Sequence, residues 1–167
     1  MNTTWMGRYR ELVAALVLHA NVVSKGLSAK YDIGDGIILS VQEWQTMEFL
    51  VEHNDANYSM TDVSRALGIP PSSFSRIVKT LKEHKLLERY QVSYNKKNVI
   101  IRATEYATTL YDKVDVSNSK AMLEDFFTDL NGLSDEDIKT ITNAIINLTK
   151  HLPSYDCYKD PELIKIE

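Results

Sequence analysis

The stretch that decides the fold is TDVSRALGIPPSSFSRIVKTLKEHK, residues 61–85. Its first part predicts a short helix, Asp62–Leu67, which Thr61 caps and Gly68 ends. Two consecutive prolines then open a second helix that ends near Lys85, because proline is tolerated in the first helical turn. The second helix places apolar residues inward at helical spacing, namely Phe74, Ile77, Val78 and Leu81. We therefore expect two short helices joined by a tight turn.

After this helix the hydrophobic period changes from helical to alternating. Leu87–Ser93 reads as a strand, Tyr94–Lys97 as a turn and Asn98–Arg102 as a second strand, which together form a β-hairpin. A helix-turn-helix followed by a basic hairpin is a winged helix-turn-helix. A helix fits the major groove of B-DNA, and a hairpin tip can straddle the backbone or enter the adjacent minor groove. The segment therefore predicts contact with double-stranded DNA.

Helices flank this segment on both sides. Upstream, we expect a long helix from about Trp5 to Ala29, a glycine-containing loop at 31–36 and another helix after Ser40. Ser40 and Glu43 have the spacing of a capping box, in which each side chain caps the other residue's backbone N–H. This helix is therefore expected to begin at Ser40.

Downstream of the hairpin we expect two further helices. Thr104 begins a long helix that Asn131 and Gly132 stop, and its candidate buried positions are Leu110, Val114, Ala121, Phe127 and Leu130. Ser134 and Asp137 have the spacing of a second capping box. The helix that follows carries an apolar stripe made of Ile138, Ile141, Ile145, Leu148 and Leu152. The fold class is therefore mainly α, with a small β-hairpin as a wing.

The composition is that of a single globular domain: 167 residues, of which 44% are hydrophobic and 25% are charged. No apolar run approaches the roughly 18 residues that a membrane-spanning helix needs, and the first 20 residues lack the pattern of a signal peptide. The single cysteine, Cys157, has no partner for an internal disulfide or a cysteine-based zinc site. We therefore expect a cytoplasmic protein that does not bind membranes.

The distribution of charge is more informative than the formal net charge of −4. The segment 65–102 holds nine basic and two acidic residues, a net charge of +7, whereas the other 129 residues carry a net charge of −11. A basic segment in an acidic protein is typical of a site that binds a polyanion. The charge pattern thus favours the same segment that the helix and hairpin pattern selects.

These residues resemble the MarR family of bacterial transcriptional regulators. The resemblance runs through VSRALGI (63–69), SSFSRIV (72–78) and LLER (86–89), and Asn95-Lys96-Lys97 corresponds to the family's wing signature Asp-Arg-Arg. The flanking helices match the family in number and order, so the resemblance covers nearly the whole chain. It implies one MarR-like domain with a winged-helix DNA-binding lobe at 39–103, dimerisation helices at 5–30 and 104–152, and a tail at 153–167.

Two departures from the family pattern concern the wing and the end of the recognition helix. Asn95 stands where the family has an Asp that often pairs with an Arg to brace the wing, and Lys96 and Lys97 lack the planar fork of arginine. We therefore expect a looser wing. The family's glycine near the end of the recognition helix is replaced by His84 or Lys85, which is costly if the position needs a positive φ.

The side chains that we expect to contact DNA are polar, and most lie on the outer face of the second helix. They are Ser72, Ser73, Ser75, Arg76, Lys79, Arg89, Lys96 and Lys97. Arginine can read guanine through two hydrogen bonds, whereas lysine neutralises phosphates. Arg89 is interpreted either as a wing brace or as a phosphate contact. The competing interpretation of the whole set is a helix face that is merely solvated.

Other chemistry-bearing residues are weighed in the same way. In the resembled family, His19, Trp44 and Tyr111 lie on helices that border an effector pocket near the dimer interface, although His19 and Trp44 can instead be core residues. Cys157 is interpreted as a bystander, because the family's oxidant sensors carry their cysteine in the first helix. The histidines show no metal-ligand spacing, and no phosphate-binding loop, nucleophile elbow or carboxylate pair is present. We expect no metal, no cofactor and no enzymatic activity.

The predicted function is a homodimeric transcriptional regulator that binds a palindromic DNA operator. The expected mechanism is repression, relieved when a small-molecule effector changes the spacing of the two recognition helices. The alternative is a winged-helix module that docks another protein without reading DNA sequence, and the net charge of +7 in 65–102 argues against it. A third interpretation is an enzyme subunit that uses this fold to dimerise, but the chain has no room for a catalytic domain.

Overall fold

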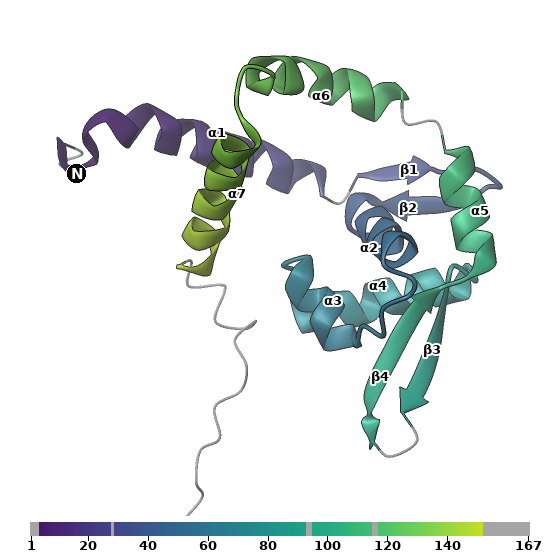
Figure 1. Cartoon of the computed structure of the whole chain (residues 1–167). Coiled ribbons are helices and arrows are strands. Elements are labelled where there is room, and N and C mark those ends of the chain that lie inside the picture. The colour runs from purple at the N-terminus through teal and green to yellow at the C-terminus, as the bar shows by residue number, and fades with distance from the viewer. Residues whose placement is uncertain (1–3, 28, 93–94, 115–116, 152–167) are drawn as a thin grey trace, which may run out of the picture.

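The computed structural model describes residues 4–27, 29–92, 95–114 and 117–151 (Figure 1). In chain order the elements are the 3-10 helix η1 (Thr4–Tyr9), α1 (Arg10–Gly26), β1 (Lys30–Asp32), β2 (Ile38–Ser40), α2 (Val41–Glu52), α3 (Met60–Ala66), α4 (Pro71–Glu83), β3 (Leu87–Val92), β4 (Asn95–Ala103), α5 (Glu105–Lys113), α6 (Ser117–Leu130) and α7 (Asp135–Lys150). The predicted fold class, mainly helical with a small β-hairpin, is confirmed.

The core lies in a packed unit that we call the winged lobe, residues 37–113. Every buried hydrophobic side chain of the described residues falls between Ile37 and Leu110. The largest fully buried one is Phe74 of α4, which packs in one cluster with residues of α2, α3, β3, β4 and α5. Removing a buried phenylalanine side chain typically costs ~3–5 kcal/mol, so the inner face of α4 is fixed by packing.

Two capping boxes set the starts of α2 and α3. The Ser40–Glu43 box is present as predicted, with the backbone N–H of Ser40 donating to Glu43 Oε2 at 2.7 Å. The predicted cap of α3 was wrong, because Ser59 and not Thr61 is the N-cap. Ser59 N–H and hydroxyl both donate to Asp62 Oδ2, and Asp62 N–H donates back to Ser59 Oγ. A serine three residues before an acid satisfies two free N–H groups at once.

The turn between α3 and α4 is fixed by one glycine and two reciprocal hydrogen bonds. Gly68 follows the end of α3 with φ +64°, a conformation that glycine adopts without a steric penalty. The N–H of Ile69 donates to the carbonyl of Ser64 at 3.0 Å, and the Ser64 hydroxyl donates to the carbonyl of Ile69 at 2.6 Å. Because Ser64 is buried, these bonds satisfy polar groups that have no access to water.

The end of α4 carries the backbone conformation that the family pattern assigns to glycine. Lys85 has φ +59°, so of the two predicted candidates the position is that of Lys85 and not His84. The carbonyl of Lys85 accepts a hydrogen bond from the Thr104 hydroxyl at 2.8 Å, and the N–H of Leu86 donates to the carbonyl of Leu81 at 2.8 Å. These contacts hold the strained turn from which the hairpin departs.

The hairpin β3–β4, residues 87–103, is the wing. It is antiparallel with a regular register from Leu87↔Ala103 to Gln91↔Val99, after which the register shifts and Val92 pairs with Asn95. Asn95 was predicted in the turn, but its backbone is already part of β4. The base of the wing is also tied to the segment between α2 and α3, because Ile101 N–H donates to the carbonyl of Tyr58 at 3.1 Å.

Three helix and strand predictions outside the winged helix were wrong. The first helix begins at Arg10 and not near Trp5, since Gly7 (φ 51°, ψ −131°) interrupts the chain. The short antiparallel hairpin β1–β2 was not predicted, and β1 contains the first two residues of the expected loop. The helix from Thr104 is two helices, because Val114 is extended (φ −64°, ψ 128°) at the end of α5.

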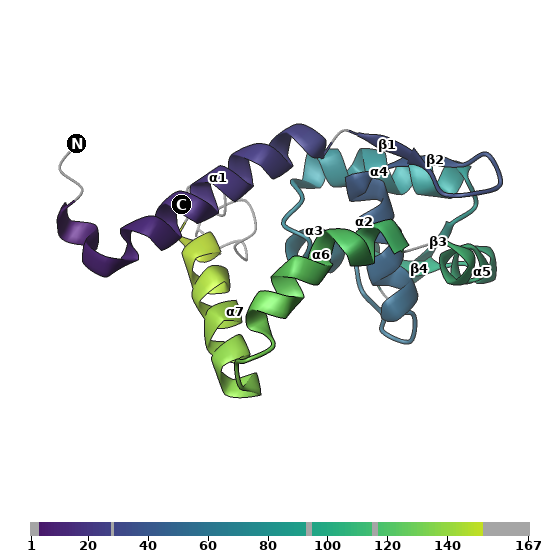
Figure 2. The same ribbon diagram turned by 90° about the horizontal axis from the view of Figure 1, so that it is seen from above.

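The break at Val114 also explains three wrong burial predictions. Leu110 is buried as expected, but Val114 and Leu130 are only half-buried and Phe127 is 52% exposed, because the chain leaves the core at the break. The side chain of Ala121 lies outside the described part. Figures 1 and 2 show α1 and α7 extending from the winged lobe on the side away from α5. Within the described ranges, no helix is long and apolar enough to cross a membrane.

Candidate nucleic-acid interface

Helix α4 separates into an apolar inner face and a polar outer face. Phe74, Ile77, Val78 and Leu81 are buried as predicted. The predicted contact residues Ser72, Ser75, Arg76 and Lys79 are all exposed, and Ser73 is half-buried. The structure therefore places the α4 members of the predicted set on the outer face of this helix, with the core behind it.

The side-chain hydrogen bonds of this face run back along α4. The Ser75 hydroxyl donates to the carbonyl of Pro71 at 3.0 Å, and the Thr80 hydroxyl donates to the carbonyl of Arg76 at 3.2 Å. A hydroxyl that donates to its own helix keeps lone pairs as acceptors. Ser75 thus presents an acceptor to a ligand, whereas the free N–H groups of the first turn present donors.

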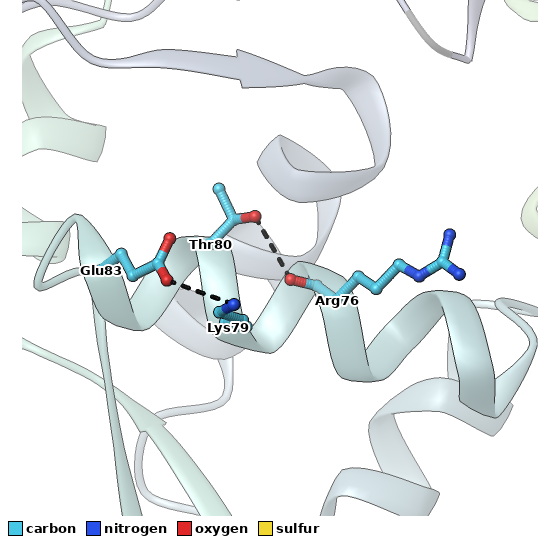
Figure 3. A network of polar contacts seen from close by, with 4 residues as sticks. All are labelled: Arg76, Lys79, Thr80 and Glu83. Carbon is cyan, nitrogen blue, oxygen red and sulfur yellow. Dashed lines mark hydrogen bonds and ion pairs between the residues drawn. The ribbon is translucent and has the colours of Figure 1, made fainter.

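Arg76 carries an accessible charge on the outer face of α4. Figure 3 shows its guanidinium extending away from Lys79 and Glu83. Among the described residues it has no ion-pair or hydrogen-bond partner for the guanidinium. Its five N–H donors are therefore available to a ligand, and their planar arrangement can match two acceptors of one guanine base.

Lys79 and Glu83 form an exposed pair one helical turn apart. The distance from Lys79 Nζ to Glu83 Oε1 is 3.8 Å, and the two side chains are 78% and 64% exposed (Figure 3). Exposed pairs at this spacing contribute only ~0.3–0.5 kcal/mol, so a phosphate can displace the carboxylate at little cost. Glu83 is the one acidic group of α4, and it limits the positive potential at the C-terminal end of the helix.

Two hollows between the end of α4 and the wing are lined by cations. The first, of 460 Å³, is lined by Lys82, Arg89, Tyr90, Gln91 and Val99. The second, of 690 Å³, is lined by Lys82, Lys85, Leu87, Glu88, Arg89, Tyr90 and Thr104. Lys82 and Lys85 were absent from the predicted contact set although both lie in the basic segment. Their position beside a wing strand depends on the fold, which the helical face alone does not give.

The two interpretations of Arg89 have different consequences for the wing. Arg89 lies on β3 and is exposed. A side-chain hydrogen bond from the wing to the α2–α3 segment is made instead by Arg102 of β4, whose guanidinium donates to Asn57 Oδ1. This arrangement favours the interpretation of Arg89 as a phosphate contact. Lys96 and Lys97 have their backbone in β4, and their side chains lie outside the described part of the chain.

The expected effector residues are only partly brought together. The rings of Trp44 and Tyr111 stack with centroids 5.7 Å apart, so these residues join α2 to α5. The Tyr111 hydroxyl donates to Glu52 Oε1 at 3.3 Å. Burial, followed by the nearby charge of Glu52, raises the pKa of Glu48. His19 is exposed on α1, and the described contacts do not join it to either ring.

Comparisons with known proteins agree with this geometry. A sequence model of the MarR family matches residues 39–96, and the predicted resemblance to the family is confirmed over that segment. No curated protein matches the chain.

Three solved structures share the fold at low sequence identity. A MepR–DNA complex from S. aureus is 15% identical and covers 91% of this chain and 99% of its own, with a TM-score of 0.52. ZitR of Lactococcus lactis, described as a zinc-responsive MarR family member, is 16% identical and covers 84% of this chain and 95% of its own, with a TM-score of 0.55. The PcaV transcriptional regulator of Streptomyces coelicolor, in complex with its natural ligand, is 12% identical over 90% and 99% (TM-score 0.55).

Proposed function

We propose, on the match of residues 39–96 to the MarR family, that this protein is a DNA-binding transcription regulator. The observation that carries the proposal is the outer face of α4. Its exposed serines, Arg76 and Lys79 stand on a helix whose other face is buried, beside a hairpin whose base carries further cations. The likeness to a MepR–DNA complex supports the same proposal.

In the proposed complex α4 lies in the major groove and the wing lies over the adjacent backbone. Arg76 reads base edges, whereas Lys79, Lys96 and Lys97 neutralise phosphates. Between the two elements one DNA strand crosses the hollow lined by Lys82 and Arg89. The function is therefore binding and not catalysis, with double-stranded DNA as the partner.

A second copy of the chain completes this proposal. One α4 and one wing cover a half-site, and a dimer that reads a palindrome holds two recognition helices about 34–36 Å apart. Helices α1 and α7 contain no buried residue, yet they carry large apolar side chains such as Leu18 (65% exposed) and Leu148 (48% exposed). A partner chain that covers these faces would keep the apolar side chains from water and would fix the spacing of the two recognition helices.

The regulatory part of the proposal is repression that a small-molecule effector relieves. The stacked pair of Trp44 and Tyr111 joins α2 to α5, the last helix of the winged lobe, which leads toward α6. A ligand that binds only when the two rings are apart favours the conformation in which they are apart. It thereby shifts the equilibrium between two positions of α5 relative to α2. A reporter gene placed behind the bound DNA, with and without added aromatic compounds, tests both repression and release.

The test of DNA binding is selection of duplexes from a random-sequence pool by the full-length protein. We expect enrichment of an inverted repeat and an affinity for it that falls steeply with salt. A scrambled duplex of equal length is the matched control, with weaker binding and a similar salt dependence. Failure to enrich any sequence, together with salt-insensitive binding to another protein, would support the docking-module alternative instead.

A further inference from the structure

Arg102 links the wing to a part of the winged lobe far away in the sequence. It is half-buried on β4, and its Nη2 donates to Oδ1 of Asn57 in the segment between α2 and α3. A hydrogen bond from a charged donor is stronger than a neutral one. The guanidinium thus fastens one side of the hairpin to the loop that precedes α3.

The same guanidinium also packs on the opposite strand of the wing. Its central carbon lies over the ring of Tyr90, 5.6 Å from the centroid. The Tyr90 hydroxyl donates to Oε2 of Glu88, and Glu88 is the residue paired with Arg102 in the strand register. Arg102 of β4 therefore contacts both β3, through Tyr90, and the α2–α3 segment, through Asn57.

Backbone contacts hold only the base of the hairpin. Tyr58 accepts the N–H of Ile101 at 3.1 Å, and Ser59 forms a β-bridge with Ile100. The regular register ends at Gln91↔Val99, so the outer part of the wing follows whatever angle the base takes.

We propose that Arg102 is a positioning residue that sets the angle of the wing relative to the winged lobe, and that it acts on DNA through Lys96 and Lys97. The inference rests on the proposed function for its effect on DNA, but the brace itself is a property of the free protein. The rival role for a cation at this place is direct contact with a phosphate. Substituting Asn57 distinguishes the two roles, because Asn57 carries no charge for a phosphate but accepts the hydrogen bond of Arg102.

The binding experiment uses the full-length protein and the duplex that it selects from a random pool. We expect Arg102→Gln and Asn57→Ala each to weaken binding about tenfold, and the double variant to bind no more weakly than Arg102→Gln alone. In a background that carries Lys96→Ala and Lys97→Ala, both losses should disappear, because a wing without contacts needs no positioning. Lys113→Gln, which removes one exposed charge from α5, is the control.

A second readout needs no DNA. Hydrogen exchange of the backbone amides in 87–92 and 99–103 should become about five- to tenfold faster in Arg102→Gln and in Asn57→Ala, with the amides of α4 unchanged. This readout separates the two proposals. If the protein binds no duplex but the two variants show the faster exchange, the proposed function is wrong and the role of Arg102 as a brace stands.

Two results would overturn the inference. The first is a loss of affinity in Arg102→Gln with a salt slope lowered by about 0.9 per protomer, while Asn57→Ala binds normally, since that pattern belongs to a phosphate contact. The second is unchanged exchange of the wing amides in both variants. Melting curves of the variants check that the winged lobe stays folded.

Discussion

Arg76 is the residue on which sequence reading depends in the proposed complex. Its guanidinium is exposed on α4 and extends away from the Lys79–Glu83 pair (Figure 3). Arg76→Ala should cost about 1–3 kcal/mol on the selected duplex and much less on a scrambled one, because only the former offers the matched base. Fluorescence anisotropy with both duplexes measures the difference. Lys79→Ala is the comparison, and it should lose equal affinity for the selected and the scrambled duplex. If Arg76→Ala also loses equal affinity for the two duplexes, Arg76 is a phosphate contact.

Glu48 makes the stability of the protein depend on pH. Burial and the nearby Glu52 raise its pKa in the folded state above the ordinary value of 4.5, so the folded protein binds this proton more tightly than the unfolded chain. The free energy of unfolding therefore falls as pH rises from 4.5 through the higher folded pKa, and stays lower above it. Glu48→Gln removes this loss.

We expect Glu48→Gln to raise the Tm at pH 7 by at most about 3 °C, since the side chain is only partly buried. The gain should shrink to zero as the pH falls below 4.5. Scanning calorimetry between pH 4 and 8 measures both values. Glu124→Gln, at an exposed position of α6, removes the same charge and is the control. A lower Tm for Glu48→Gln at pH 7 would contradict the assignment.

At the scale of elements, the wing is predicted to contribute affinity without sequence preference. Lysine carries charge without a planar fork, so Lys96 and Lys97 suit phosphates. Replacing both with alanine should lower the slope of log affinity against log salt by about 0.9 for each phosphate that the wing neutralises, on selected and scrambled duplexes alike. Titrations at several salt concentrations give the slope. An unchanged slope would show that the wing does not touch DNA.

Elements with strong local signals were predictable from the sequence, and elements stabilised by tertiary contacts were not. Helix α4 was predicted with its faces because Phe74, Ile77 and Leu81 repeat at helical spacing and become buried. The β1–β2 hairpin was missed because each strand has three residues and pairs only across a loop that docks on α5, where Tyr106 donates to Asp35. The break at Val114 has no glycine or proline to mark it.

The same distinction applies to the candidate site. Arg76 and the serines follow from the helical face, a local property. Lys82 joins Arg89 in one hollow only because β3 returns beside α4, and Arg102 meets Asn57 across 45 residues of sequence. Such contacts depend on the folded topology, and one sequence without its fold does not reveal them.

At the scale of the whole molecule, the exposed apolar faces of α1 and α7 predict a dimer. Leu148→Glu places a charge where the proposed interface excludes water, which costs several kcal/mol. We expect dissociation or unfolding of the dimer and loss of tight operator binding. Asn143→Glu, on another face of α7, is the matched control. Light scattering measures the mass, and a wild-type monomer of 19.1 kDa that binds the operator fully would refute the dimer.

The left-handed backbone of Lys85 has a consequence for the balance between stability and affinity. A side chain at φ +59° costs ~1 kcal/mol or more, part of which glycine would recover. Lys85→Gly should therefore raise the Tm by a few degrees, about 2–4 °C at most. The same change removes a cation from the hollow that Lys82 and Arg89 also line, so binding to any duplex should weaken.

Lys85→Ala separates the two effects, since it removes the cation and keeps the strained backbone. It should bind DNA as weakly as Lys85→Gly and show no gain in Tm. If Lys85→Gly binds as tightly as the wild type, the lysine contributes nothing to binding. Otherwise glycine at position 85 favours thermal stability and lysine favours affinity for a polyanion. A variant selected for heat resistance alone would then bind DNA more weakly.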